Sequence, residues 1–393
     1  MAVIWPVTNS TEKQFSLNRG ASRKQFPIRN FIRCLVLIVL AGLPLRQASA
    51  ADGFIWLNVS VKMIVDPATG QIPTTNSDAL LNESFGLMNR WLANTWRGYR
   101  VRAADLDTSG NFKRIGSLND TTGPGKWYAI DLKYNVTNRQ QFVTQAQANK
   151  TQFGWNDYAI NIYINNGDYS SEGEGFIISA YNLLLDDLVK GRSGAFGYQV
   201  AGNLLHEIGH FMGLGHTFPD DGFTDTAPDP NTAPGRNETA IRNSIALTNW
   251  SMNYSSLTTD RKILVDNTAN NAMSYYQLFY DDPAQSKVLT DAERYGPTRF
   301  VITERQMDWW TDYANGNNSN VTTGVTKFVD AAAASGGNGT SAAPFNTLAA
   351  GVTAVTGGAD IVLLRPGTYS ATTLTKPLTI RVSRPGAAVI IRP

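Results

Sequence analysis

Three histidines stand close together in the middle of the chain, and they are all the histidines that its 393 residues contain. The segment from His206 to His216 reads HEIGHFMGLGH. On a helix, His206 and His210 project from the same face because they are four residues apart, so both imidazoles can reach one metal ion. Three neutral imidazoles leave a fourth position open for water, which is typical of a catalytic zinc site. We therefore expect Zn²⁺ at His206, His210 and His216.

Two further residues of this segment suit hydrolysis. Glu207 follows His206 and projects towards the same cleft, where it can reach a metal-bound water as a general base. Gly213 lets the helix end and the chain turn sharply, which brings His216 back as the third ligand. One alternative is a helix whose histidines only pack or form hydrogen bonds, and the rare HExxHxxGxxH spacing argues against it. Another is a site that binds zinc without cleaving.

The motif resembles the signature of the metzincin clan of zinc peptidases. Within that clan, residues 155–295 are most similar to the pappalysin-like secreted peptidases. The sequence segments that carry this similarity are Gly213-Leu214-Gly215-His216-Thr217-Phe218 and Asp221-Gly222 with Asp225-Thr226-Ala227-Pro228. The chain departs from common members of that group because it lacks the cysteines that cross-link the loop after His216. The resemblance implies an α+β catalytic domain, with a mixed twisted sheet and an active-site helix, and the activity of a secreted zinc-dependent endopeptidase.

The resemblance also implies a tight turn with a methionine beneath the metal. Met273 and Met252 are the two candidates, and we prefer Met273 because Leu289–Arg294 resembles the helix that follows the turn in the clan. Ordinary core packing is the alternative for either methionine. If Met273 marks the turn, Tyr275 is the second expected catalytic residue, since a tyrosine at that place in some metzincins hydrogen bonds the tetrahedral intermediate.

The mechanism that these residues indicate needs no covalent intermediate. Zinc lowers the pKa of its water and polarises the scissile carbonyl, while Glu207 moves the proton from the water to the leaving amine. Zinc, helped by Tyr275, would stabilise the oxyanion. We expect a protein or peptide substrate bound along a sheet edge, supplied by residues 158–164 or by the following segment to Tyr181. The alternative is a catalytically silent, zinc-binding adhesion or carbohydrate-binding protein.

Calcium is a second candidate cofactor, for the acidic loop that follows His216. Asp220, Asp221, Asp225 and Asp229 carry the hard oxygen ligands that Ca²⁺ prefers. Solvated acids in turns are the alternative, and we favour it.

The N-terminus has the pattern of an export signal. A basic region ends at Arg33, the apolar run Cys34–Leu45 follows, and Ala48-Ser49-Ala50 forms a cleavage site. The run is too short to span a bilayer comfortably, although an uncleaved anchor is the alternative. We predict a signal peptide at 1–50 and a secreted protein, extracellular or periplasmic, with no membrane contact after its removal. Cys34 is the only cysteine, so the mature chain would have no disulfide, Cys-bound zinc or thiol nucleophile.

The charge balance gives no reason to expect nucleic-acid binding. Seven of the 34 basic residues and one of the 32 acidic residues lie in the predicted signal peptide. The remaining chain is therefore mildly acidic, whereas nucleic-acid-binding domains present basic patches.

Hydrophobic periodicity predicts one α+β domain over residues 51–315, with a sheet backed by helices. Residues 217–270 have little periodicity and are expected to form a long structured loop region, and 290–313 contain helical stretches. The expected strands are 54–65, 99–106, 126–134, 158–164 and 175–181, and the expected helices are 77–97, 138–150 and 195–214.

The composition shifts after a predicted linker at 316–325. Residues 326–393 are rich in Ala, Gly and Thr, with short β runs between Gly/Pro turns. Segments such as Gly336-Gly337-Asn338-Gly339-Thr340 and Leu364-Arg365-Pro366-Gly367-Thr368-Tyr369 resemble the opening coils of a right-handed, pectate-lyase-like parallel β-helix. Only one or two coils fit before Pro393, whereas a solenoid needs several to bury its faces. A small β appendage is the alternative, and a carbohydrate or surface contact would involve this segment.

Overall fold

The computed structural model describes most of the chain between Asp52 and Pro393, within one compact unit that extends from Gln47 to Pro393. Only the backbone is described for 176–177, 182–186 and 197–199. The predicted signal peptide and Tyr275 lie outside the described residues. Within those residues, no helix is long and apolar enough to cross a membrane. The described residues are 52–72, 78–132, 135–167, 176–177, 182–186, 197–218, 221–230, 238–274, 299–384, 386 and 388–393.

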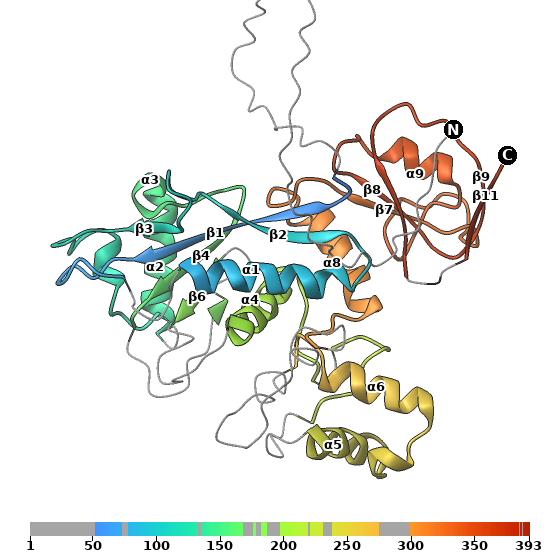
Figure 1. Ribbon diagram of the computed structural model, residues 1–393, viewed down its shortest axis with the longest axis horizontal. Coiled ribbons are helices and arrows are strands. Elements are labelled where there is room, and N and C mark those ends of the chain that lie inside the picture. The colour runs from blue at the N-terminus through green and yellow to red at the C-terminus, as the bar shows by residue number, and fades with distance from the viewer. Residues whose placement is uncertain are drawn as a thin grey trace, which may run out of the picture. The chain divides into compact units, whose positions relative to one another are not determined.

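A six-stranded sheet forms the centre of the N-terminal part (Figure 1). Its strands are β1 (Ile55–Ile64), β2 (Tyr99–Ala104), β3 (Lys113–Ile115), β4 (Ile160–Asn165), β5 (Phe176–Ile177) and β6 (Asn182–Asp186). The order is β2-β1-β4-β6-β5, and β3 pairs with the C-terminal end of β1. Every pair is parallel except β5 with β6, which is antiparallel.

Helices cover both faces of this sheet, and β1 is buried on both faces from Val59 onward. The helices are α1 (Asp78–Ala93), α2 (Val136–Ala148), α3 (Lys150–Phe153) and α4 (Gly197–Phe211). On one face, the odd-numbered residues from Ile55 to Met63 pack into the main core with α1 and α4. On the other face, Ile64 and Tyr163 form a second core with Phe142 of α2 and Phe153 of α3. Alternation along β1 therefore places α4 against one defined face.

The prediction of a strand at 126–134 is wrong. Asp120 accepts a hydrogen bond from the backbone N–H of Gly123 (2.7 Å), and this turn leads into the 3₁₀ helix η1 (Pro124–Trp127). Trp127 then turns inward and packs edge to face against Phe142, with ring centroids 5.6 Å apart. The aromatic residues Trp127 and Tyr128, which give this segment the pattern of a strand, instead belong to the second core. The short strand β3 was not predicted.

Residues 158–164 cannot supply a sheet edge for a substrate. They contain β4, which pairs with β1 on one side and with β6 on the other. Among the described strands, β5 ends the sheet on this side. It lies within the second segment considered, up to Tyr181, of which residues 165–167 and 176–177 are described.

The prediction of irregular structure over 217–270 is wrong for its second half. Two helices, α5 (Glu238–Trp250) and α6 (Thr259–Ala269), flank the 3₁₀ helix η2 (Tyr254–Ser256). Ile241, Ile245 and Val265 are fully buried in a small core of their own. Because α5 and α6 pack against each other, a few apolar residues on each helix are enough to form their shared core. Such a narrow apolar stripe gives only a weak helical periodicity in the sequence.

The C-terminal part begins with α8 (Glu304–Gly316), which overlaps the region 290–313 expected to contain helical stretches and continues to the first residue of the predicted linker. The strands that follow are β7 (Thr326–Val329), β8 (Ile361–Leu364), β9 (Gly367–Ser370), β10 (Thr379–Val382) and β11 (Val389–Arg392), with the helix α9 (Leu348–Ala354) between β7 and β8. They form two parallel sheets, of order β10-β8-β7 and β11-β9. None of the three sheets of the described chain is closed. The described fold is therefore mixed α/β.

The predicted linker, residues 316–325, is packed against the N-terminal part. Asn318 is 1% exposed and donates a hydrogen bond to the backbone oxygen of Phe211 (2.8 Å). The backbone N–H of Asn58 in β1 donates to the oxygen of Val321 (2.9 Å). The chain thus passes along the end of α4 before it enters β7.

A buried arginine ties the C-terminal part to the N-terminal part. Arg97 is 1% exposed, its Nη2 lies 2.6 Å from a carboxylate oxygen of Asp308 in α8, and its Nη1 donates to the oxygen of Ser383. Asp308 also lies 3.4 Å from Arg365. Phe328 of β7 and Ile361 of β8 belong to the same core as β1. The two parts are therefore joined by apolar packing and by a charge network.

We expect Arg97→Ala to lower the free energy of unfolding by about 3–5 kcal/mol, because it leaves Asp308 in a buried position with a weaker partner. Arg102→Ala is the matched control, since Arg102 is exposed and makes one hydrogen bond, to Asn58. That control should cost less than about 1 kcal/mol. Urea unfolding followed by circular dichroism measures both values. Equal losses in the two variants would contradict a structural role for the buried network.

Candidate metal site

The helix α4 carries the first two histidines and is held by its apolar face. Leu204, Leu205 and Ile208 are fully buried in the main core, against α1 and the sheet. His206 and His210 therefore point away from this face. Gly209 lies at the closest approach to the turn that contains Met273, since a Cβ atom there would collide with the sulfur of Met273. A glycine is needed at this position for the helix and the turn to touch.

The three histidines meet at their Nε2 atoms. The Nε2–Nε2 distances are 3.1 Å between His206 and His210, 3.2 Å between His206 and His216, and 3.0 Å between His210 and His216. The turn that brings His216 back passes through Gly213, which has a φ of 80°. Such a backbone conformation favours glycine. The three side chains form a group that could hold a metal ion, the only such group found among the described residues.

Hydrogen bonds of the other ring nitrogen fix the tautomers of two histidines. The Nδ1 of His206 lies 2.8 Å from the oxygen of Ala272, and the Nδ1 of His210 lies 2.7 Å from the oxygen of Leu214. A carbonyl oxygen only accepts, so Nδ1 carries the proton in each neutral ring. The Nε2 lone pairs are thereby directed at the common point, which is the arrangement that metal-binding histidines require.

Burial keeps all three imidazoles neutral at physiological pH. It lowers the pKa of His206 well below its ordinary value, and the neighbouring His210 and His216 lower it further. Burial also lowers the pKa of His210. The pKa of His216 falls to about 4, through burial first and through His210 second. A metal ion entering at neutral pH would therefore displace no proton from these rings.

The other predicted site residues are described in part. Glu207 directly follows His206 in α4 and is 9% exposed, so it is buried beside the histidine group. Met273 is fully buried under Gly209, whereas Met252 is 39% exposed. Tyr275 and Leu289–Arg294 lie outside the described residues.

The turn at 271–274 is held from two directions. The backbone N–H of Met273 donates to the side chain of Asn271 (2.9 Å), and Ala272 donates through its N–H to the oxygen of Val301 (2.7 Å). Asn271 and Gln306 are fully buried and exchange side-chain hydrogen bonds of 2.9 and 3.3 Å. The Ala272 carbonyl that orients His206 is thus positioned by the start of α8.

Sequence reasoning missed the part that α8 plays. Gln306 completes a capping box with Thr303, and the pattern Thr303-x-x-Gln306 signals a helix start that could have been recognised. Trp309, one turn along, donates from Nε1 to the oxygen of Gly213 (2.8 Å) and so supports the turn before His216. Nothing in the sequence indicates that contact.

The acidic loop after His216 is held by hydrogen bonds. Asp221 accepts from the N–H of Phe223 and the hydroxyl of Thr226, while Asp225 accepts from Thr303 and from the N–H of Arg305 at the start of α8. These carboxylates, with Asp229, form no metal-binding group among the described residues, and Asp220 lies outside them. The geometry thus gives calcium no support at the three described acids.

Asp229 connects the third histidine to the methionine turn. It is fully buried, and its Oδ2 lies 3.4 Å from the hydroxyl of Thr217 and 3.3 Å from that of Ser274. Its backbone N–H donates to the oxygen of Thr217 (2.7 Å). Thr217 follows His216 and Ser274 follows Met273, so one carboxylate holds both segments together.

This chain was compared with protein-family models and with curated proteins. No protein-family model matches it, and no curated protein is significantly similar to it.

We expect Asp229→Ala to weaken metal binding about 10–100-fold, the usual effect of removing a group that positions a metal ligand. Asp221→Ala is the matched control, because the side chain of Asp221 accepts hydrogen bonds within its own loop, from Phe223 and Thr226. Competition titration with a chromophoric chelator measures the affinity. An affinity in Asp229→Ala equal to that of the control would show that Asp229 does not position the site.

The metal-free protein should lose stability as the pH falls from 6.5 towards 4. Because burial lowers the pKa of His216 from 6.5 to about 4, the unfolded chain binds a proton at this residue in that interval and the folded chain does not. His216→Gln removes this contribution and should flatten the dependence. Urea unfolding at a series of pH values, with a chelator present, measures it in both proteins. The same slope in both would contradict the prediction.

Proposed function

We propose that this chain is a secreted zinc-dependent endopeptidase, in which His206, His210 and His216 hold the ion and Glu207 is the general base. The observation that carries the proposal is the convergence of three Nε2 atoms within 3.0–3.2 Å of one another. Two of the three imidazoles belong to α4, which also carries the buried Glu207. Three nitrogen ligands with a carboxylate alongside, and an open fourth position, are the composition of hydrolytic zinc sites.

The donor set fits zinc. A tetrahedral ion with Zn–N bonds of about 2.0–2.1 Å needs its nitrogens about 3.3–3.4 Å apart, close to the distances seen here. Imidazole nitrogens suit zinc and other borderline metals, whereas magnesium and calcium prefer oxygen. The hydrogen bonds of His206 and His210 at Nδ1 also match the outer contacts that tune zinc-bound histidines.

Each residue has a defined part in the proposed reaction. Zinc, when bound, would supply a Lewis acid that polarises the scissile carbonyl and acidifies a water. Glu207 would take the proton of the attacking water and deliver it to the nitrogen of the leaving amine. Tyr275 stays a proposed second donor to the oxyanion.

The resemblance to metzincins supports the same assignment. The contact of Met273 with Gly209, beneath the histidines, supports Met273 over Met252 as the methionine of the turn. The position of β5 at the end of the sheet, antiparallel to β6, supports this strand as the edge that binds an extended peptide. Secretion rests on the N-terminal signal pattern alone.

The C-terminal segment bears on the alternative function. β8 and β9 pair in parallel with β10 and β11, and this stacking supports the resemblance to β-helix coils. A silent adhesion or carbohydrate-binding protein would use this segment and keep the zinc as a structural ion. Buried Glu207 favours the peptidase, because a structural zinc has no use for a general base.

We expect Glu207→Gln to abolish peptide cleavage, with a loss of at least about 10²–10⁴-fold in kcat, because the amide cannot accept the proton of the water. Zinc content should stay at one ion per chain. The assay is hydrolysis of an unbiased peptide library, with and without a chelator. Glu83→Gln, an exposed position on α1, is the matched control and should leave cleavage unchanged.

Two results would overturn the proposal. One is cleavage that survives both chelation and Glu207→Gln, since it would belong to another site. The other is a preparation that holds one zinc per chain, also after limited proteolysis, and cleaves no peptide of the library. That second result would favour the silent binding protein.

A further inference from the structure

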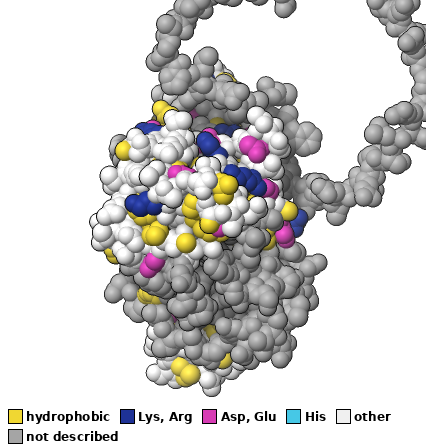
Figure 2. Space-filling view, turned by 90° about the vertical axis from the view of Figure 1, so that its left-hand side faces the viewer, with side chains coloured by type: hydrophobic (Ala, Val, Ile, Leu, Met, Phe, Trp, Pro, Cys, Tyr) yellow, Lys and Arg dark blue, Asp and Glu magenta, His cyan; other side chains and the backbone are white. Residues whose placement is uncertain are grey.

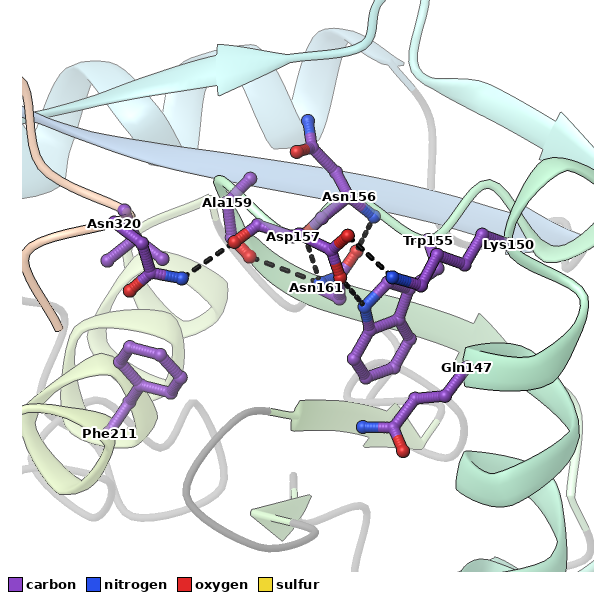
Figure 3. A pocket seen from close by; sticks show the side chains of 10 residues that line it. Gln147, Lys150, Trp155, Asn156, Asp157, Ala159, Asn161, Phe211 and Asn320 are labelled. Carbon is purple, nitrogen blue, oxygen red and sulfur yellow. Dashed lines mark hydrogen bonds and ion pairs between the residues drawn. The ribbon is translucent and has the colours of Figure 1, made fainter. Parts of the chain in front are cut away.

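A cavity lies at the start of β4, and none of the three histidines lines it. Its volume is about 450 Å³, within the range of about 300–1,000 Å³ that is typical of small-ligand sites. Asn320 and Phe211 lie on one side of it in Figure 3, and Trp155, Lys150 and Gln147 lie on the other. The walls thus come from α2 and α3, from the loop before β4, from the end of α4 and from the segment that leads to β7.

The indole of Trp155 forms a rigid wall of this cavity. Its Nε1 donates to Asp157 (3.1 Å), and the other oxygen of Asp157 lies 2.6 Å from Nζ of Lys150. Behind it, the buried ring of Tyr163 is stacked at a centroid distance of 6.5 Å and an angle of 27°. A ring held by a hydrogen bond and by a second ring loses little further freedom when a ligand covers it.

The polar groups beside this ring are neutral overall. Lys150 and Asp157 neutralise each other, at 49% and 51% side-chain exposure. The side-chain amide of Gln147 and the Oδ1 of Asn320 have no hydrogen-bond partner among the described residues. The Nδ2 of Asn320 donates to the backbone oxygen of Asp157 (2.6 Å). Amide groups both donate and accept, so they match ligand groups that do the same.

Asn161 closes the polar side of the cavity and is itself fixed. It is 2% exposed, its Oδ1 accepts from Nζ of the buried Lys62 and from the N–H of Asn156, and its Nδ2 donates to the oxygens of Asn156 and Ala159. Every polar atom of this side chain is therefore satisfied within the protein. The base of the cavity is structural, and recognition is left to the groups at its rim.

We propose that this cavity binds a neutral sugar ring, with the ring stacked on Trp155 and its hydroxyl groups bonded to Gln147, Asn320 and the Lys150–Asp157 pair. A pyranose has an apolar C–H face for an aromatic wall and hydroxyl groups that donate and accept around its edge, which is the pattern of this lining. An anionic or cationic ligand finds no excess charge here. Apolar ligands would leave the amides and the ion pair unsatisfied.

Figure 2 views the molecule from the side of α2 and α3 and is consistent with a neutral ligand. On the described part of that face, basic, acidic and apolar side chains are interspersed. The surroundings therefore favour neither charge. The proposed pocket is independent of the histidine group, so its occupancy does not depend on the proposed peptidase activity.

Saturation-transfer NMR on the full chain tests the proposal, with a chelator present so that the metal site is silent. The probes are the methyl glycosides of glucose, galactose, mannose and N-acetylglucosamine, with glucuronate and triglycine as comparators, each at up to about 10 mM. We expect at least one neutral glycoside to bind, and Gln147→Ala to weaken it about tenfold. Trp155→Ala should abolish its signal.

Gln152→Ala is the matched control, because Gln152 is an exposed glutamine of the neighbouring helix α3 and lines a different cavity. It should bind the same glycoside as the unaltered chain. Since Trp155 packs against Tyr163, the exposed Gln147 variant keeps the test valid if Trp155→Ala fails to fold. Absence of binding by all four glycosides, binding that Gln147→Ala leaves unchanged, or binding of triglycine or glucuronate alone would overturn the proposal.

Discussion

The ability of the histidine group to bind a metal depends on the hydrogen-bond acceptors of its Nδ1 atoms. An imidazole can present Nε2 to a metal only if Nδ1 holds its proton, and here the oxygens of Ala272 and Leu214 keep it there for His206 and His210. Leu214 is a local acceptor, supplied by the turn that ends α4. Ala272 is a distant one, and its carbonyl is held in place by the hydrogen bonds of the turn at 271–274.

That distant carbonyl explains the role of α8. The helix begins with a capping box at Thr303 and Gln306, and Gln306 reaches Asn271 in the turn beside Ala272. Trp309 of the same helix supports Gly213 on the other side of the histidine group. One short helix therefore fixes both the acceptor for His206 and the turn that returns His216. Its position matters to the site although it carries no ligand.

The C-terminal segment is part of this support. Asp308 of α8 lies between the buried Arg97 and Arg365, and Asp312 accepts hydrogen bonds from Ser341. Phe328, Ile361 and Leu363 extend the core that lies under β1. The composition of this segment differs sharply from that of the preceding chain. Even so, the segment packs into the same hydrophobic core and takes part in the same network of charged residues. The boundary visible in the sequence is a boundary of composition, and the core continues across it.

The sequence alone determined what depends on spacing along a single element. His206 and His210 share a helix face because they are four residues apart, and strong periodicity placed β1, α1 and α4 within a few residues of their observed bounds. Tertiary structure decided what depends on contacts between distant segments: Trp127 became a core anchor, 238–269 became two helices, and Asp229, Gln306 and Trp309 became supports of the site. No local pattern encodes such pairings, because each exists only once the fold brings its two partners together.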